Sequence, residues 1–210
     1  MFITFEGIEG SGKTTQIKQI LNYLRGKGYN CIGTREPGDT VVGQKIRSIL
    51  LNPDHSDLVP QAELFLYAAD RAQHIRERIM PALTDGKVVV CDRFSDATTA
   101  YQGYARGLDL SLIEKINTIV LGELKPDITF LFDLSPEVGL KRAWKQIDGG
   151  SRSGAETRFE KEKLSFHEKV RQGYLKLAEH EPERIMIIDA SKNEDEVRQQ
   201  IIDIIALKMS

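Results

Sequence analysis

The chain has 210 residues, of which 40% are hydrophobic and 29% are charged, and its formal net charge is −2 at pH 7. This length and composition predict a globular protein with a single domain over residues 1–210. The small negative charge argues against a nucleic-acid polymer as the main partner, although a local basic pocket is compatible with it.

The cysteines and the apolar stretches indicate where such a chain works. Cys31 and Cys91 each lie inside an apolar run, so we expect two small buried residues rather than a disulfide or a metal pair. No apolar stretch approaches the ~18 residues of a membrane span. Because the N-terminus already has the pattern of a strand and a loop, we expect no signal peptide and a cytoplasmic location.

Apolar strand-like runs alternate with helical patterns, which predicts an α/β fold with a parallel sheet covered by helices on both faces. The predicted strands are residues 1–5, 30–34, 87–91, 128–133 and 185–189. The predicted helices are residues 14–27, 41–51, 61–83, 96–103, 111–121, 136–146, 160–179 and 194–209.

The segment Gly7-Ile8-Glu9-Gly10-Ser11-Gly12-Lys13-Thr14 fits the phosphate-loop pattern between the first strand and the first helix. Its small residues let backbone N–H groups turn towards a phosphate, while Lys13 adds a mobile positive charge and the Thr14 hydroxyl can bind Mg²⁺. A helix that begins near Thr14 directs its positive end at the same anion. A chance glycine-rich turn is the alternative, but the flanking strand and helix favour a nucleotide site.

Two further strand ends carry charged residues. Asp92 follows an apolar strand, where it can hold Mg²⁺ or cap the next helix. Arg93 comes directly after it, and Arg35 precedes a Pro-Gly pair that indicates a turn. Since ligands of open α/β sheets bind at the carboxyl ends of strands, we expect Arg35 and Arg93 at the rim of one crevice.

Tyr67 and Arg71 are four residues apart and share one face of a predicted helix. Such a pair can stack on a base and hydrogen-bond to its edge. The residues alone favour the alternative, in which Tyr67 lies in the core and Arg71 pairs with Asp70 or Glu77. The chain lacks the Asn-Lys-x-Asp motif, which argues against a GTPase switch, and we expect its histidines at the surface: His55, His74, His167 and His180.

A segment rich in glycine and serine connects two predicted helices at residues 148–156. Its composition alone favours a plain surface loop. Arg152 and the nearby Arg158 instead favour a mobile lid, at about residues 146–159, that carries arginine onto a nucleotide phosphate.

Several motifs, in one order along nearly the whole chain, resemble the thymidylate kinase (dTMP kinase) family. They are Phe5-Glu6-Gly7-Ile8-Glu9-Gly10-Ser11-Gly12-Lys13-Thr14-Thr15, Arg35-Glu36-Pro37-Gly38, Asp92-Arg93-Phe94, Ala100-Tyr101-Gln102-Gly103, Pro126-Asp127 and Gly139-Leu140-Lys141-Arg142.

The resemblance implies the three-layer nucleoside monophosphate kinase fold, with a five-stranded parallel sheet, and a homodimer. It also implies transfer of the γ-phosphoryl group of ATP to dTMP with Mg²⁺, which forms dTDP and ADP for dTTP synthesis. Another nucleoside monophosphate kinase or a deoxynucleoside kinase is the alternative. A phosphate-loop module that binds a nucleotide without turnover is the hypothesis from a different class.

Carried over by position, the resemblance implies a role for each motif residue. The residues implied for ATP are Gly7, Ile8, Glu9, Gly10, Ser11, Gly12, Lys13, Thr14, Thr15 and Arg142, and those implied for Mg²⁺ are Thr14 and Asp92. The residues implied for dTMP are Arg35 and Arg93 at its phosphate, Tyr67, Arg71 and Thr98 at its base, Tyr101 and Glu9 at its sugar, and Gln102. The residues implied for catalysis are Lys13, Arg93, Arg152, Arg158 and Glu9.

Members of the family place a catalytic arginine either inside the phosphate loop or in the lid. Gly10 stands at the loop position here, whereas the lid contains arginines, so the chain resembles the bacterial-type layout with lid arginines. The chain departs from the residues common in the family at Tyr67, Ala97 and Asp39, none of which belongs to the phosphoryl-transfer residues.

Overall fold

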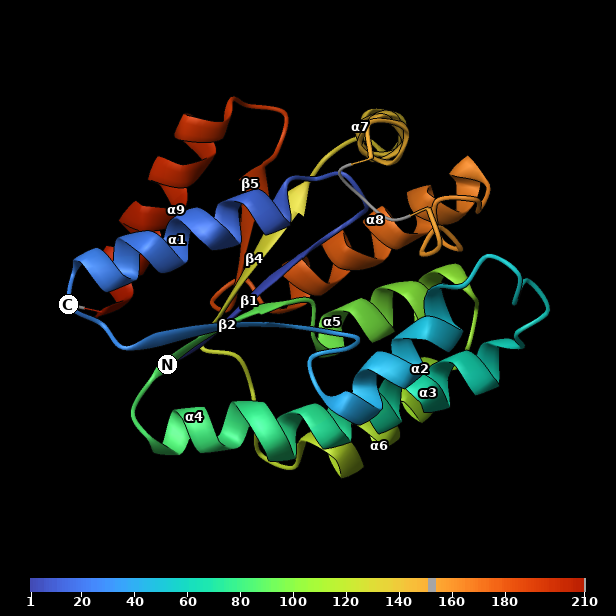
Figure 1. Ribbon diagram of the computed structural model, residues 1–210, viewed down its shortest axis with the longest axis horizontal. Coiled ribbons are helices and arrows are strands. Elements are labelled where there is room, and N and C mark those ends of the chain that lie inside the picture. The colour runs from blue at the N-terminus through green and yellow to red at the C-terminus, as the bar shows by residue number, and fades with distance from the viewer. Residues whose placement is uncertain (151–153, 210) are drawn as a thin grey trace.

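The computed structural model describes residues 1–150 and 154–209 and shows three layers, with a central sheet between two sets of helices (Figure 1). The five strands are all parallel, in the order β2-β3-β1-β4-β5. They are β1 (Phe2–Gly7), β2 (Cys31–Arg35), β3 (Val88–Asp92), β4 (Ile128–Asp133) and β5 (Ile185–Asp189). The predicted parallel sheet, covered on both faces, is confirmed.

Helices α1 and α9 lie on one side of the sheet, with α4 and α8 on the other (Figure 1). The α-helices are α1 (Lys13–Gly26), α2 (Val41–Leu51), α3 (Pro60–His74), α4 (Met80–Thr84), α5 (Ser95–Thr98), α6 (Leu110–Leu121), α7 (Pro136–Asp148), α8 (Leu164–His180) and α9 (Glu194–Met209). Two π-helical turns, η1 (Ile75–Ile79) and η2 (Thr99–Ala105), continue α3 and α5. No helix within the described residues is long and apolar enough to cross a membrane.

Alternating side chains of the central strands divide the core between the two faces of the sheet. Ile3 and Phe5 of β1 pack with the apolar face of α1, whereas Phe2 packs with Val89 and with Ile79 of η1. The two cysteines are buried and unpaired thiols, as predicted. Burial of both sheet faces explains why the strands were recognisable as continuous apolar runs.

Three predicted helices differ from the observed ones. The predicted helix 96–103 is the short α5 followed by the π-helical turn η2, which ends at Ala105. The predicted helix 61–83 is one continuous helical run, but its centre is the π-helical turn η1. The predicted helix 160–179 begins only at Leu164, because residues 157–162 are held in turns by backbone hydrogen bonds from Lys161 to Thr157 at 3.1 Å and from Glu162 to Phe159 at 3.0 Å.

Candidate active site

The loop between β1 and α1 folds around the side chain of Lys13. The ammonium group donates to the carbonyl oxygens of Gly7 and Ile8, both at 2.9 Å, and to the Ser11 hydroxyl at 3.2 Å. Burial and the neighbouring charge of Arg93 lower the pKa of Lys13 to about 8. A positive charge is therefore held inside the loop where the sequence predicts phosphate.

Helix α1 starts at the end of this loop without a side-chain cap. Thr40 accepts a hydrogen bond from the Gly43 N–H at the start of α2, at 2.9 Å, whereas Gly12 has no side chain to offer at the start of α1. Gly12 has a φ of 93°, and the first turn of α1, all of it described, contains no acidic residue. The first N–H groups and the positive end of α1 remain available to an anion.

The two residues predicted to bind Mg²⁺ meet at the mouth of the loop. Thr14 donates its hydroxyl to Asp92 Oδ2 at 3.1 Å, and Asp92 ends β3 in register with Phe5 of β1. A hydroxyl and a carboxylate fit Mg²⁺, which takes its other ligands from phosphates and water. Over the described part of the chain, no group of three or more His, Cys, Asp or Glu side chains could hold a metal ion.

Arg93 is fixed both by its backbone and by its side chain. Its φ is 69°, a left-handed conformation that residues other than glycine rarely adopt, and its N–H donates to the Phe5 carbonyl at 3.0 Å. The guanidinium donates to Glu9 Oε1 at 2.9 Å and to the Tyr174 hydroxyl at 3.2 Å, and it lies 5.0 Å from the centre of the Tyr101 ring. Such strain persists only where the surroundings enforce it, and it is common at functional sites.

Glu9 is a buried carboxylate surrounded by donors. Its Oε1 accepts from Arg93 and, at 2.6 Å, from the Tyr101 hydroxyl, while its Oε2 lies 3.2 Å from His167 Nδ1. Burial alone would raise the pKa of Glu9, but the Arg93 charge and the contact with His167 hold this pKa well below its usual value. Glu9 is therefore ionised at neutral pH although it is buried.

Arg71 is part of a buried cluster at the end of β2. It donates from Nε to Glu36 Oε2 at 2.7 Å and from Nη2 to the Phe94 carbonyl at 3.0 Å. The expected pairing of Arg71 with Asp70 or Glu77 was wrong, because its ion pair is with Glu36, on the neighbouring sheet edge.

Three further residues predicted to bind dTMP lie on α3, α5 and η2. Tyr67 is half-buried, because one side of it packs on the core while another lines the cavity described below. Thr98 is 2% exposed, and its hydroxyl has no hydrogen-bond partner among the described residues. Gln102 donates to Glu63 at 2.8 Å, which orients its amide. Because a buried unpaired hydroxyl costs roughly 1–3 kcal/mol, Thr98 favours a ligand that bonds to it.

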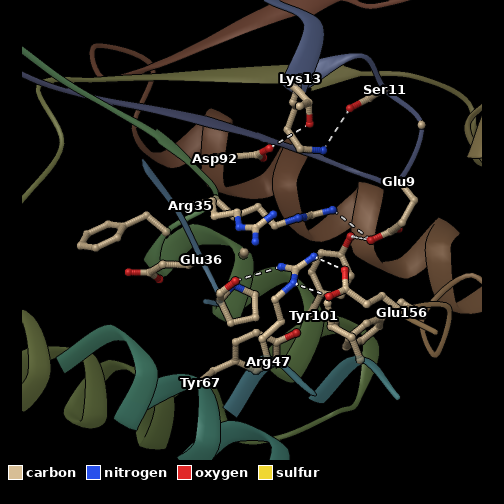
Figure 2. A pocket seen from close by; sticks show the side chains of 18 of the residues that line it. Glu9, Ser11, Lys13, Arg35, Glu36, Arg47, Tyr67, Asp92, Tyr101 and Glu156 are labelled. Atoms are coloured by element: carbon tan, nitrogen blue, oxygen red, sulfur yellow. Dashed lines mark hydrogen bonds and ion pairs between the residues drawn. The ribbon is translucent and has the colours of Figure 1, made fainter. Parts of the chain in front are cut away.

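These elements enclose one cavity of about 640 Å³. Figure 2 shows Lys13 and Asp92 at one end of it and Tyr67 at the other, with Arg35 between them. The predicted site residues that line the cavity are Glu9, Gly10, Ser11, Gly12, Lys13, Thr14, Thr15, Arg35, Tyr67, Arg71, Asp92, Arg93, Thr98, Tyr101 and Gln102.

Two predicted site residues point elsewhere in this structure. Arg158 is buried and donates to Glu63 and to the Leu50 carbonyl, and so it ties the segment after residue 153 to the end of α2. Arg142 donates to the Ala190 carbonyl at 3.1 Å. Arg152 lies outside the described residues.

Our sequence reasoning missed an ion pair at the cavity wall. Arg47 of α2 bonds Glu156 through Nε to Oε1 at 2.9 Å and through Nη2 to Oε2 at 2.6 Å, and both residues line the cavity (Figure 2). The partners are 109 residues apart, so no local pattern signals the pair.

Two of the histidines expected at the surface are fully buried instead. His74 lies 2.9 Å from Glu36, and His167 contacts Glu9. Their charged sequence neighbours suggested exposure, but the carboxylates that accompany them in the interior come from distant loops.

Comparisons with known proteins agree with this geometry. Residues 5–201 match the family described as thymidylate kinase. The thymidylate kinase of Desulfosudis oleivorans is 59% identical over 202 residues, which cover 96% of this chain and 94% of that protein. The thymidylate kinase of Geotalea daltonii is 55% identical over 197 residues, which cover 94% and 92%.

The solved structure of thymidylate kinase from Ehrlichia chaffeensis aligns with a TM-score of 0.77 at 34% identity and covers 98% of each chain. This similarity confirms the predicted three-layer nucleoside monophosphate kinase fold with its phosphate loop. On the combined sequence and structural similarity, the chain belongs to the thymidylate kinase family.

Proposed function

We propose that the protein transfers the γ-phosphoryl group of ATP to dTMP, forming dTDP and ADP as a step in dTTP synthesis. The observation that carries the proposal is the single cavity that joins the phosphate loop to a second pocket rich in arginine. A donor and a phosphorylated acceptor can share this cavity, whereas an enzyme that only hydrolysed ATP would not need the second pocket.

On the donor side, Lys13 and the N–H groups of the loop bind the ATP phosphates. Thr14 and Asp92, whose oxygens meet at the mouth of the loop, would hold Mg²⁺, and the ion would supply positive charge that neutralises the phosphates. Arg142 lies beyond the loop in α7 and packs on adenine. The uncapped start of α1 supports this assignment, because it directs N–H groups at an anion.

On the acceptor side, Arg35 and Arg93 bind the dTMP phosphate and Tyr67 stacks on thymine. Arg71, Thr98 and Gln102 bond to the base edge, with the unpaired Thr98 hydroxyl as the strongest support. Tyr101 lies beneath the sugar and disfavours a 2′-hydroxyl, and Glu9 faces the 3′-hydroxyl.

The transfer itself needs charge more than acid–base chemistry. A dTMP phosphate oxygen is already anionic near neutral pH, so no general base is required. The task is to bring two anions into line, and Lys13, Arg35 and Arg93 offset their repulsion. We assign the remaining charge to the lid predicted at about residues 146–159, which would close over ATP and exclude water, while Arg158 holds its end to Glu63 and Leu50.

Of the two lid arginines, Arg152 is the better candidate for contact with the transferring group. To reach the transferring phosphoryl group, Arg158 would first have to break its hydrogen bonds to Glu63 and to the Leu50 carbonyl.

A substrate panel tests the proposal. ADP release is measured with dTMP, dUMP, CMP, AMP and thymidine as acceptors, and we expect dTMP to give the highest kcat/KM. A preference for thymidine would indicate a nucleoside kinase, and no ADP with any acceptor would indicate a binding module.

We also propose a cytoplasmic homodimer. Apolar side chains of α3 and α6, helices that pack on each other, remain exposed in the single chain, among them Phe65 at 59% and Ile119 at 83%. Sedimentation at micromolar concentration tests this assembly, and Phe65→Asp is expected to shift it towards the monomer.

A further inference from the structure

His167, in the first turns of α8, joins the phosphate loop to the segment that follows residue 153. The ring is fully buried, and its Nε2 lies 3.0 Å from the Phe159 carbonyl oxygen. A carbonyl oxygen can only accept a hydrogen bond, so Nε2 must carry a proton.

The other ring nitrogen faces a carboxylate. Nδ1 of His167 lies 3.2 Å from Glu9 Oε2 in an ion-pair contact, and neither atom has a hydrogen-bond partner within the described residues. A bare Nδ1 would set two acceptors against each other at this distance, so either Nδ1 or Glu9 has to carry a proton. Arg93 and Tyr101 bind the opposite oxygen and keep Glu9 ionised, which leaves this proton on the histidine.

The charges around the ring favour its protonated form. Burial would lower the pKa of His167, but hydrogen bonding to Glu9 and the negative charge of Glu9 raise it, with smaller contributions from the Phe159 carbonyl and Glu160. The carboxylates come from the phosphate loop and from the turn before α8, and Arg93 lies on the far side of Glu9.

We propose that His167 is a positioning residue for phosphoryl transfer, whose charged ring fixes the Glu9 carboxylate and ties it to the Phe159 backbone. The Phe159 ring meets Tyr101 edge-on, with 5.4 Å between the ring centres. One histidine thus connects the acceptor pocket to Phe159, at the end of the proposed lid. The inference rests on the proposed function, in which Glu9 faces the sugar of dTMP.

Three variants test the role kinetically. His167→Phe keeps an aromatic ring without donors, whereas His167→Asn places an amide nitrogen near the position of Nδ1. His180→Gln changes an exposed histidine of the same helix and serves as the control. We expect His167→Phe to raise the KM for dTMP roughly 10- to 100-fold, the range for a lost hydrogen bond to a charged group, and to leave the KM for ATP within about twofold.

His167→Asn should recover part of this loss, and His180→Gln should match the wild type. A role confined to folding would lower the amount of active enzyme but would leave the KM for dTMP unchanged. An unchanged KM for dTMP in a folded His167→Phe would overturn the inference.

Nitrogen-15 NMR of the wild-type protein tests the pair directly, even if a variant does not fold. At neutral pH and without substrate, we expect both ring nitrogens of His167 to carry protons. A neutral His167 ring would contradict the inference. If the wild type released no ADP with dTMP, the proposed function would fail, while the NMR spectrum would still decide whether His167 and Glu9 form a charged pair.

Discussion

Gly10 of the phosphate loop lies directly against Gly139 of α7, so that a Cβ at Gly10 would come within 2.0 Å of the Gly139 carbonyl oxygen. The approach is reciprocal, because a Cβ at Gly139 would come within 2.5 Å of the Glu9 carbonyl oxygen. Gly10 also has a φ of 69°. The close backbone contact and the positive φ both exclude a side chain at Gly10. This favours a catalytic arginine supplied from the lid.

Gly10→Ala is therefore expected to disturb the loop. We predict a loss of more than about 2 kcal/mol in the free energy of unfolding and a higher KM for ATP, because backbone atoms cannot yield as a side chain can. Gly26→Ala is the control, because among the described residues no atom other than its chain neighbours and its own helix backbone lies within 4 Å of the Cβ position, and the change should leave stability unchanged or slightly higher. Thermal unfolding measures both, and equal shifts in Tm would contradict the prediction.

Substitutions of the two lid arginines are expected to have different effects. Arg158→Met removes one partner of the fully buried Glu63, so we predict a loss of roughly 2–5 kcal/mol in the free energy of unfolding. Arg152→Ala should leave stability unchanged and lower kcat by roughly 10³-fold, as expected for an arginine at a transferring phosphoryl group. Urea unfolding and steady-state kinetics separate the two, and exchanged phenotypes would reverse the assignment.

The strands and the loop could be predicted because their signals are local. The strand bounds at Ile128–Asp133 and Ile185–Asp189 were predicted without error, since buried parallel strands are continuous apolar runs. The loop pattern places Lys13 and Thr14 by spacing alone. The structure then shows that β3 pairs with β1, which places Asp92 beside Phe5.

The buried ion pairs could not be predicted in this way. His167 reaches Glu9 across 158 positions, and Arg71 reaches Glu36 across 35, so the identity of each partner depends on how the loops pack. Arg158 looked like a lid residue because it closely follows the glycine- and serine-rich segment at residues 148–156. Its partner in the structure is Glu63 of α3, and the sequence around Glu63 does not indicate that this residue is buried.

The buried Asp70 is expected to make the free energy of unfolding depend on pH. It is 1% exposed, and burial and the charge of Glu36 raise its pKa from 3.8 to about 6. Between these values the unfolded chain is ionised while the folded chain keeps the proton, so stability falls as pH rises through this window, and the full penalty persists above it.

Asp70→Asn cannot ionise and keeps an acceptor for the Gly38 N–H, which Asp70 binds at 3.1 Å. We expect this variant to raise the free energy of unfolding by about 1–2 kcal/mol above the raised pKa, less than the full shift would give because one amide group stays unpaired. Below the unfolded pKa the difference should vanish. Urea unfolding at both ends of the window measures it, and a gain that does not vary with pH would exclude Asp70 as its source.

Substitutions of Thr98 and Thr4 can separate an effect on dTMP binding from an effect on folding stability. Both are buried, but the Thr98 hydroxyl has no partner within the described chain, whereas Thr4 Oγ1 lies 2.7 Å from Thr129 Oγ1. We expect Thr98→Val to keep or raise the free energy of unfolding and to weaken dTMP binding roughly tenfold, because the ligand loses a buried hydrogen bond.

Thr4→Val should behave in the opposite way, with a loss of about 1 kcal/mol in the free energy of unfolding and unchanged dTMP affinity. Titration calorimetry with dTMP and urea unfolding of both variants give the four values needed. If Thr98→Val bound dTMP as tightly as the wild type, the Thr98 hydroxyl would not contact the base, and Arg71 and Gln102 would have to carry the recognition of its edge.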